Sequence, residues 1–174
     1  MLFLVRVENM LGTLFGKIWD LILPCFFHPY VDIELKSDGY GKRINGLVPS
    51  KEPVHVSEAV YNYDFHWDYV MIIKNNSSKS AYNLKIEKQN DFFRITTPLD
   101  KTASLQPHDV LELKCVVSHS ETMKGSASVQ VLKQFPYFTN KIQIVLSYQN
   151  ERHKQFYTVF VYDKNGQNNG YKKK

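Results

Sequence analysis

The stretch Val31-Asp32-Ile33-Glu34-Leu35-Lys36 alternates apolar with charged residues, which is the period-two pattern of a half-buried β-strand. The same alternation recurs at Tyr82–Glu87, Leu111–Val117 and Ile142–Tyr148. Further strand candidates are Val54–Val60, Trp67–Lys74, Phe92–Thr97, Ser126–Phe135 and Gln155–Asp163. Eight or nine short strands, with no convincing helix among them, predict an all-β fold in the form of an antiparallel sandwich.

Turn signals rich in Gly, Pro, Asn, Asp and Ser separate these strands. The longest irregular stretch is Gly39–Pro53, which we expect to form a loop at one rim of the sandwich. The composition places the β-domain over residues 30–164 and a polar basic tail over residues 165–174. One domain with a short N-terminal appendage fits the length of 174 residues.

Residues 69–86 read as an apolar strand, then Asn75, a turn, Ala81, Asn83 and an alternating strand. This order resembles a strand–turn–strand of immunoglobulin-like domains in prokaryotic membrane-associated proteins. Ser77 and Ser80 stand where that family has Gly and Pro.

Two later segments are similar to the same family. Leu105-Gln106-Pro107-His108 precedes a strand, with His108 where the family has glycine, and Ile144–Tyr148 leads through a polar turn into Phe156–Tyr162. The resemblance spans about residues 69–163. It implies an immunoglobulin-like sandwich in a bacterial protein, and it implies no particular function.

The N-terminal residues 1–29 follow a different pattern. Apolar residues recur there at helical spacing, interrupted by Arg6, Glu8, Lys17 and Asp20, which predicts an amphipathic or membrane helix. Gly12 and Gly16 form a small-xxx-small pair suited to helix packing. The side chains expected to bind the membrane are Leu11, Leu14, Phe15, Ile18, Trp19, Ile22, Phe26 and Phe27.

Three arrangements of this helix remain open. It lies on the membrane, it crosses the membrane as part of an oligomer that shelters Lys17 and Asp20, or it packs on protein. A sandwich closes its own core, which favours contact with the membrane.

No constellation of side chains for catalysis, metal binding or cofactor binding emerges, and we predict no enzyme activity, no metal and no cofactor. Cys25 and Cys115 lie in segments of different character, so we expect no disulfide between them. The most suggestive polar group is Asp64, His66 and Asp68, which would share one face of a strand. A polar outer strand face explains the same alternation, and we favour that interpretation.

Binding to nucleic acid is also not expected. Tyr61, Tyr63, Phe65, Trp67 and Tyr69 alternate along one run and could stack bases on an exposed face, but the same pattern is typical of a buried sandwich face. The residues between them include Asp64 and Asp68, whose charge repels phosphate. The net charge of +5 is too modest to decide otherwise.

The leading hypothesis is a non-enzymatic, membrane-associated protein-interaction module on the cytoplasmic side of the inner membrane. Its partners would be a membrane surface or membrane protein and an unidentified protein, with homo-oligomerisation through the helix as a further option. One alternative is a small membrane-perturbing effector of the anti-phage defence type, whose helix acts on oligomerisation. Another is a soluble subunit whose helix is buried by a partner chain.

Overall fold

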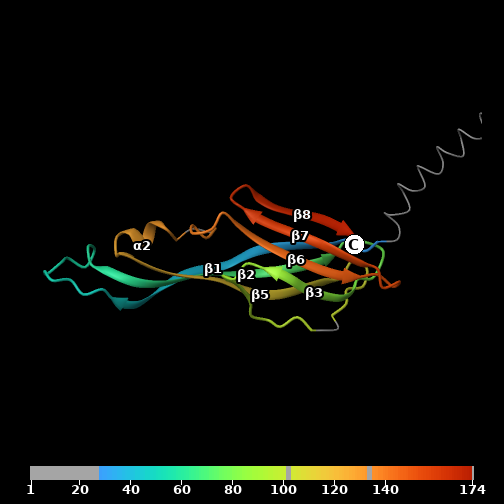
Figure 1. Cartoon of the computed structure of the whole chain (residues 1–174), viewed down its shortest axis with the longest axis horizontal. Helices are drawn as coiled ribbons and strands as arrows, with labels where there is room; N and C mark the ends of the chain where they lie inside the picture. The colour runs from blue at the N-terminus through green and yellow to red at the C-terminus, as the bar shows by residue number, and fades with distance from the viewer. Residues whose placement is uncertain (1–27, 101–102, 133–134, 174) are drawn as a thin grey trace, which may run out of the picture.

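The computed structural model describes residues 28–100, 103–132 and 135–173. These residues form two antiparallel four-stranded sheets with the strand orders β1-β2-β5-β4 and β3-β6-β7-β8 (Figure 1). The elements are β1 (Val31–Leu47), β2 (Val60–Asn75), β3 (Tyr82–Gln89), β4 (Phe93–Ile95), β5 (Val110–Lys124), α2 (Ala127–Gln130), β6 (Lys141–Gln149), β7 (Gln155–Asp163) and β8 (Gly166–Lys173). The predicted all-β sandwich is confirmed.

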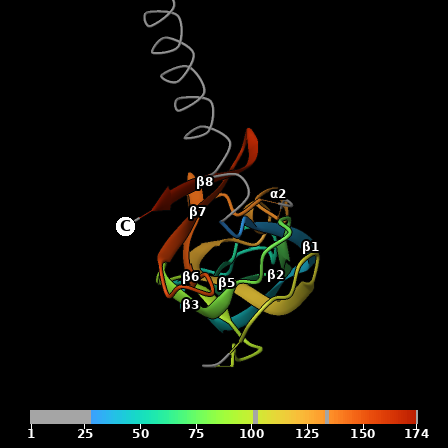
Figure 2. The same ribbon diagram turned by 90° about the vertical axis from the view of Figure 1, so that its right-hand side faces the viewer.

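The two sheets face each other as layers when the molecule is viewed from one end (Figure 2). Each sheet turns alternate residues inward, and these side chains merge into one core. Trp67 of β2, Leu113 of β5 and Ile144 of β6 are buried there, with at most 2% of each exposed. The period-two apolar positions of the sequence are therefore the ones that hold the sheets together.

The long strands β1, β2 and β5 continue beyond the second sheet and form an extension (Figure 1). The prediction of a loop over Gly39–Pro53 is wrong for its first half, because β1 runs on to Leu47. Its pairing with β2 shifts between Ser37 and Gly39 and again between Ile44 and Gly46. Each such bulge moves the alternation by one residue, which hides the strand from a search for period two.

Residues 125–132 and 135–140 cover the inner face of this extension, which the second sheet does not reach. The strand predicted over Ser126–Phe135 is wrong, since the segment contains the short helix α2. Tyr137 and Phe138 pack on Phe65 and Trp67 with ring centroids 5.6–6.0 Å apart. An irregular connection can bury aromatic side chains without strand periodicity. Its apolar residues were therefore mistaken for a strand.

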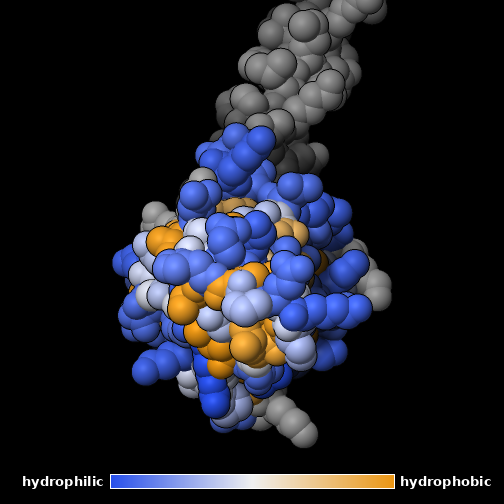
Figure 3. Space-filling view, turned by 90° about the vertical axis from the view of Figure 1, so that its left-hand side faces the viewer, coloured by the Kyte–Doolittle hydropathy of each residue, from blue (hydrophilic) through white to orange (hydrophobic). Residues whose placement is uncertain are grey.

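The end of the extension exposes several aliphatic side chains (Figure 3). The chain turns there between β1 and β2, so the strand predicted over Val54–Val60 is also wrong except for its last residue. Backbone N–H groups of Glu58 and Ala59 both donate to the carbonyl of His55, closing a turn. The exposed aliphatic residues are Ile44, Leu47, Val48, Val54 and Val56.

The polar tail predicted over residues 165–174 is instead mostly the edge strand β8, paired with β7 from Gly166 to Lys173. Its composition resembles a solvated tail because nearly all of its side chains face water. Two of them reach the other sheet. Asn169 and Gln167 each donate to and accept from the backbone of β1, at Ile33 and Leu35 respectively.

The predicted N-terminal helix lies outside the described residues, as do its ten predicted membrane-binding and packing residues from Leu11 to Phe27. Within the described part of the chain, no helix is both long enough and apolar enough to span a bilayer.

Candidate functional site

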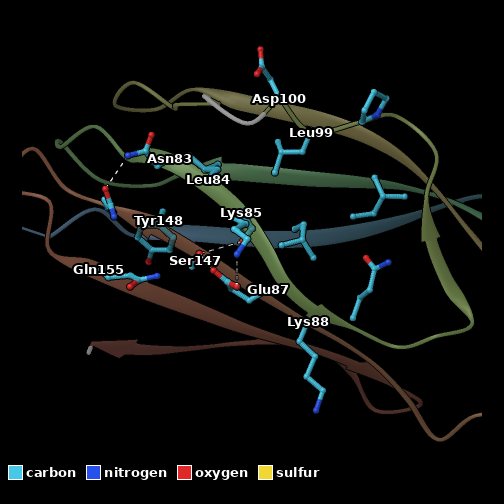
Figure 4. Close-up of a pocket in the computed structure, with 15 residues that line it drawn as sticks. Asn83, Leu84, Lys85, Glu87, Lys88, Leu99, Asp100, Ser147, Tyr148 and Gln155 are labelled. Carbon is cyan, nitrogen blue, oxygen red and sulfur yellow. Dashed lines mark hydrogen bonds and ion pairs between the residues drawn. The ribbon is translucent and has the colours of Figure 1, made fainter.

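A groove of about 890 Å³ runs along one side of the sandwich, between β3 and the segment that follows β4 (Figure 4). Strand β3 contributes residues 83–89 and the segment after β4 contributes Pro98, Leu99 and Asp100. Ser147, Tyr148 and Gln149 of β6 and Gln155 of β7 complete the lining at one end. The volume falls in the range of clefts that bind ligands in proteins.

The groove exists because β3 is an edge strand whose outer edge is only half covered. Its first half is met by residues 103–105: Ala81 and Leu105 form an antiparallel bridge, and the Leu84 N–H donates to the Ala103 carbonyl at 3.0 Å. From Lys85 to Gln89, no described strand pairs with this outer edge. In the described part of the chain, this half of β3 is therefore unpaired strand backbone beside a groove.

The core side of the groove is apolar. Ile86 of β3, Ile95 of β4 and Leu99 all pack partly buried against the core. Leu99 lies across the groove from β3 (Figure 4). Such an apolar wall beside strand backbone is the combination that peptide-binding sheet edges use.

The outer side of the groove is polar. Lys85 Nζ lies 3.0 Å from Glu87 Oε2, and the Ser147 hydroxyl donates to Glu87 Oε1 at 2.8 Å (Figure 4). The hydrogen bond from Ser147, then that from Lys85, holds the pKa of the Glu87 carboxyl below its usual range. Glu87 is therefore ionised at neutral pH and neutralises Lys85.

At the far end of the groove, Gln89 has an incompletely satisfied amide. Its Nε2 donates to the Phe93 carbonyl at 3.0 Å. Its Oε1 is buried and accepts no hydrogen bond within the described structure, where it is the one buried side-chain polar atom in this condition. Buried polar atoms are normally paired, so this end of the groove is polar and under-satisfied.

Asn75, Asn83 and His108 lie in or beside the turns that frame the groove. Asn75 is fully buried, and its amide donates to the carbonyls of Leu105 and Gln106. Asn83 has a φ of 53°, and His108 has a φ of 67°. Both conformations lie in the left-handed region, which glycine adopts most easily.

Asp64, His66 and Asp68 alternate with buried residues of β2, and each makes its own contacts. Asp64 accepts a hydrogen bond from Ser120, and the His66 ring lies over Gly41, with Nε2 only 2.8 Å from where a Cβ would be. His66 Nε2 is 3.8 Å from Asp68 Oδ2 in an exposed pair. No group of three potential metal ligands occurs in the described residues.

The aromatic run of β2 is core, as the sequence predicts. Tyr63, Phe65, Trp67 and Tyr69 are at most 3% exposed, and Tyr61 packs partly buried against them. The four buried rings are covered by other side chains and present no free face for stacking bases.

The sequence did not identify the groove residues Lys85, Glu87, Gln89 and Leu99. They follow ordinary strand and turn patterns, and only the strand order shows that β3 lies at an edge. The one available signal was Leu99 between Pro98 and Asp100, an apolar residue in a turn.

No known protein family matches this sequence, and no curated protein matches it. Among solved structures, one similar chain is described as the crystal structure of FixG-related protein from Vibrio parahaemolyticus. It is 12% identical, with 77% of this chain and 95% of that chain covered and a TM-score of 0.29. This likeness is too low to carry an argument about function.

Proposed function

We propose that this protein is a non-enzymatic, membrane-associated interaction module, in which an immunoglobulin-like sandwich binds a partner protein at the groove beside β3. The observation that carries the proposal is the free half of β3 next to an apolar wall. A sheet edge of this kind binds protein through its backbone, and it needs no catalytic group.

Strand order supports the immunoglobulin-like part of the proposal. A constant-type immunoglobulin domain has strands A-B-E-D in one sheet and C-F-G in the other. If β1 to β7 are lettered A to G in chain order, the two sheets read A-B-E-D and C-F-G. Strand β8 is an addition beyond β7.

The membrane part of the proposal is supported by the helical spacing of apolar residues in the N-terminal segment. The described domain begins at His28, at the end of the sandwich opposite the exposed aliphatic residues of the extension (Figure 1). An N-terminal anchor on the cytoplasmic side of the inner membrane would leave the side of the sandwich accessible to a partner.

Two experiments test the proposal. The first is fractionation of full-length protein and a variant lacking residues 1–29. We expect full-length protein to sediment with membranes and the truncated protein to be soluble, with the circular dichroism of a folded β-protein. Full-length protein that remains in the soluble fraction would contradict the membrane part.

The second experiment compares proteins captured from gently solubilised membranes by the wild type, Leu99→Asp and Val110→Asp. Leu99 lies in the groove, whereas Val110 is 54% exposed at the start of β5 and outside the groove. We expect the wild type and Val110→Asp to retain the same partner and Leu99→Asp to lose it. Thermal melts establish that the Leu99→Asp protein is folded, and an unchanged set of partners would disprove the role of the groove.

A further inference from the structure

The molecule itself shows how a chain pairs with the outer edge of β3. Residues 103–105 run antiparallel to the first half of β3, through the Ala81–Leu105 bridge and the hydrogen bond from Leu84 to Ala103. The Ala103 N–H donates to the Asp100 carbonyl at 3.1 Å. This chain therefore begins the line of pairing, and after Leu84 no described residue continues it.

The open half of the edge is bordered by side chains that would select an incoming strand. Side chains alternate between the two faces of a strand, so every second residue of an added strand would face the core side. The residues on that side are Ile86, Ile95 and Leu99, all partly buried and apolar. They suit aliphatic side chains at alternate positions.

The outer side of the same edge offers one uncompensated charge. Lys85 and Glu87 neutralise each other at 3.0 Å, whereas Lys88 is exposed and makes no ion pair with any described residue. Opposite charges on neighbouring strands attract, and like charges repel. An acidic residue is therefore the favoured neighbour of Lys88.

We propose that the free edge of β3, Lys85–Gln89, receives an extended acidic-aliphatic segment of the partner protein as an added antiparallel strand. Aliphatic side chains at alternate positions face Ile95 and Leu99, and an Asp or Glu lies beside Lys88. This inference rests on the proposed function and adds to it the chemical class of the partner segment.

The test uses random heptapeptides displayed on phage and selected on the full-length protein, followed by synthesis of the selected peptides. We expect a consensus that alternates aliphatic with polar residues and contains Asp or Glu. Hydrogen exchange measured by NMR should slow at the backbone amides of residues 85–89 when the peptide binds. Absence of a consensus, or protection at another surface, would overturn the inference.

Exchanging the charges of the peptide residue and of Lys88 tests whether the two side chains interact. Replacing the acidic residue of the peptide with Lys should weaken binding to the wild type by about two- to five-fold, the range of an exposed ion pair. Lys88→Glu should reverse this preference, and Lys164→Glu, an equal charge change at the exposed β7–β8 turn, should not. Equal preferences in all three proteins would remove the acidic residue from the proposal.

The capture experiment and the peptide selection together distinguish failure of strand addition from failure of the proposed function. If Leu99→Asp loses the captured partner but no linear peptide binds the groove, the partner docks as a folded surface. The proposed function then stands and the strand-addition inference fails. If Leu99→Asp retains the partner and no peptide binds, both fail.

Discussion

At the scale of single residues, Asn75 connects three parts of the chain. Its Nδ2 group donates to the carbonyls of Lys79, Leu105 and Gln106 at 2.7–3.1 Å, and its Oδ1 accepts from the Ser77 hydroxyl at 2.7 Å. Two N–H groups thus serve three carbonyls, which requires a shared hydrogen bond. The amide joins the β2–β3 turn to the segment that borders the groove.

Replacing Asn75 with Leu should lower the free energy of unfolding by about 3 kcal/mol or more, because several buried backbone groups lose their partner at once. Urea denaturation measures this change. Asn76→Ala serves as the control, since Asn76 is exposed and, among the described residues, its side chain bonds only the Asp32 carboxylate. A loss for Asn75→Leu no larger than that of the control would show that the connection is dispensable.

Cys115 makes stability depend on pH in the alkaline range. Burial raises the pKa of its thiol to about 12, whereas an unfolded cysteine ionises near 8.5. The unfolded chain therefore loses a proton first, and the stabilisation that is full below pH 8.5 declines as the pH rises toward 12.

Between pH 8 and 10 this thiol should reduce stability by about 2 kcal/mol. The measurement compares urea denaturation of Cys25→Ser with that of Cys25→Ser/Cys115→Ala, so that the tyrosines contribute equally to both. We expect the double variant to show a smaller decline over this range. Parallel declines in the two proteins would indicate that the Cys115 thiol ionises as easily in the folded state.

At the scale of elements, β8 protects the edge of β1 with side chains instead of backbone. The Asn169 amide accepts from Ile33 N–H at 3.1 Å and donates to Ile33 O at 2.9 Å. Gln167 repeats the pair at Leu35, at 2.8 and 2.7 Å. Each amide reproduces the hydrogen bonds of a neighbouring strand, so this part of the edge is closed to other chains.

Asn169→Val should therefore speed hydrogen exchange of the Ile33 amide by about ten-fold, equivalent to a loss of about 1.4 kcal/mol of local protection. NMR-detected exchange measures this, with Asn168→Val, an exposed neighbour on β8, as the control. If the Ile33 amide exchanges equally fast in both variants, another group protects the edge of β1.

The sequence predicts the strands whose two faces differ and misses the features that depend on strand order. Val31–Lys36 and Ile142–Tyr148 are strands with the predicted inward residues. The bulges of β1 and the polar strand β8 were missed, because neither keeps an apolar period of two. The groove was missed for a different reason: Lys85–Gln89 becomes a free edge only when β3 lies at the end of its sheet.

At the scale of the whole molecule, the inner face of the long sheet is covered in two ways. Near the N-terminal end of β1, the second sheet packs on it. Along the extension, residues 125–132 and 135–140 take over that role, and Phe138 contacts rings from three other parts of the chain. Its ring lies 5.6 Å from Trp67, 5.2 Å from Phe92 and 4.2 Å from His119, stacked on the last.

Phe138→Ala should expose the inner face of the long sheet near Trp67 to water. Loss of a large aromatic side chain from a core costs about 3–5 kcal/mol, and the partial exposure of Phe138 places the expected loss near the lower limit. In a Trp19→Phe background Trp67 is the only tryptophan, so its emission should shift to the red as water reaches the ring. Val129→Ala, at an exposed position on α2 in the same segment, should change neither quantity. Unchanged emission in Phe138→Ala would mean that Tyr137 alone shields Trp67, held in place by its contact with Glu121.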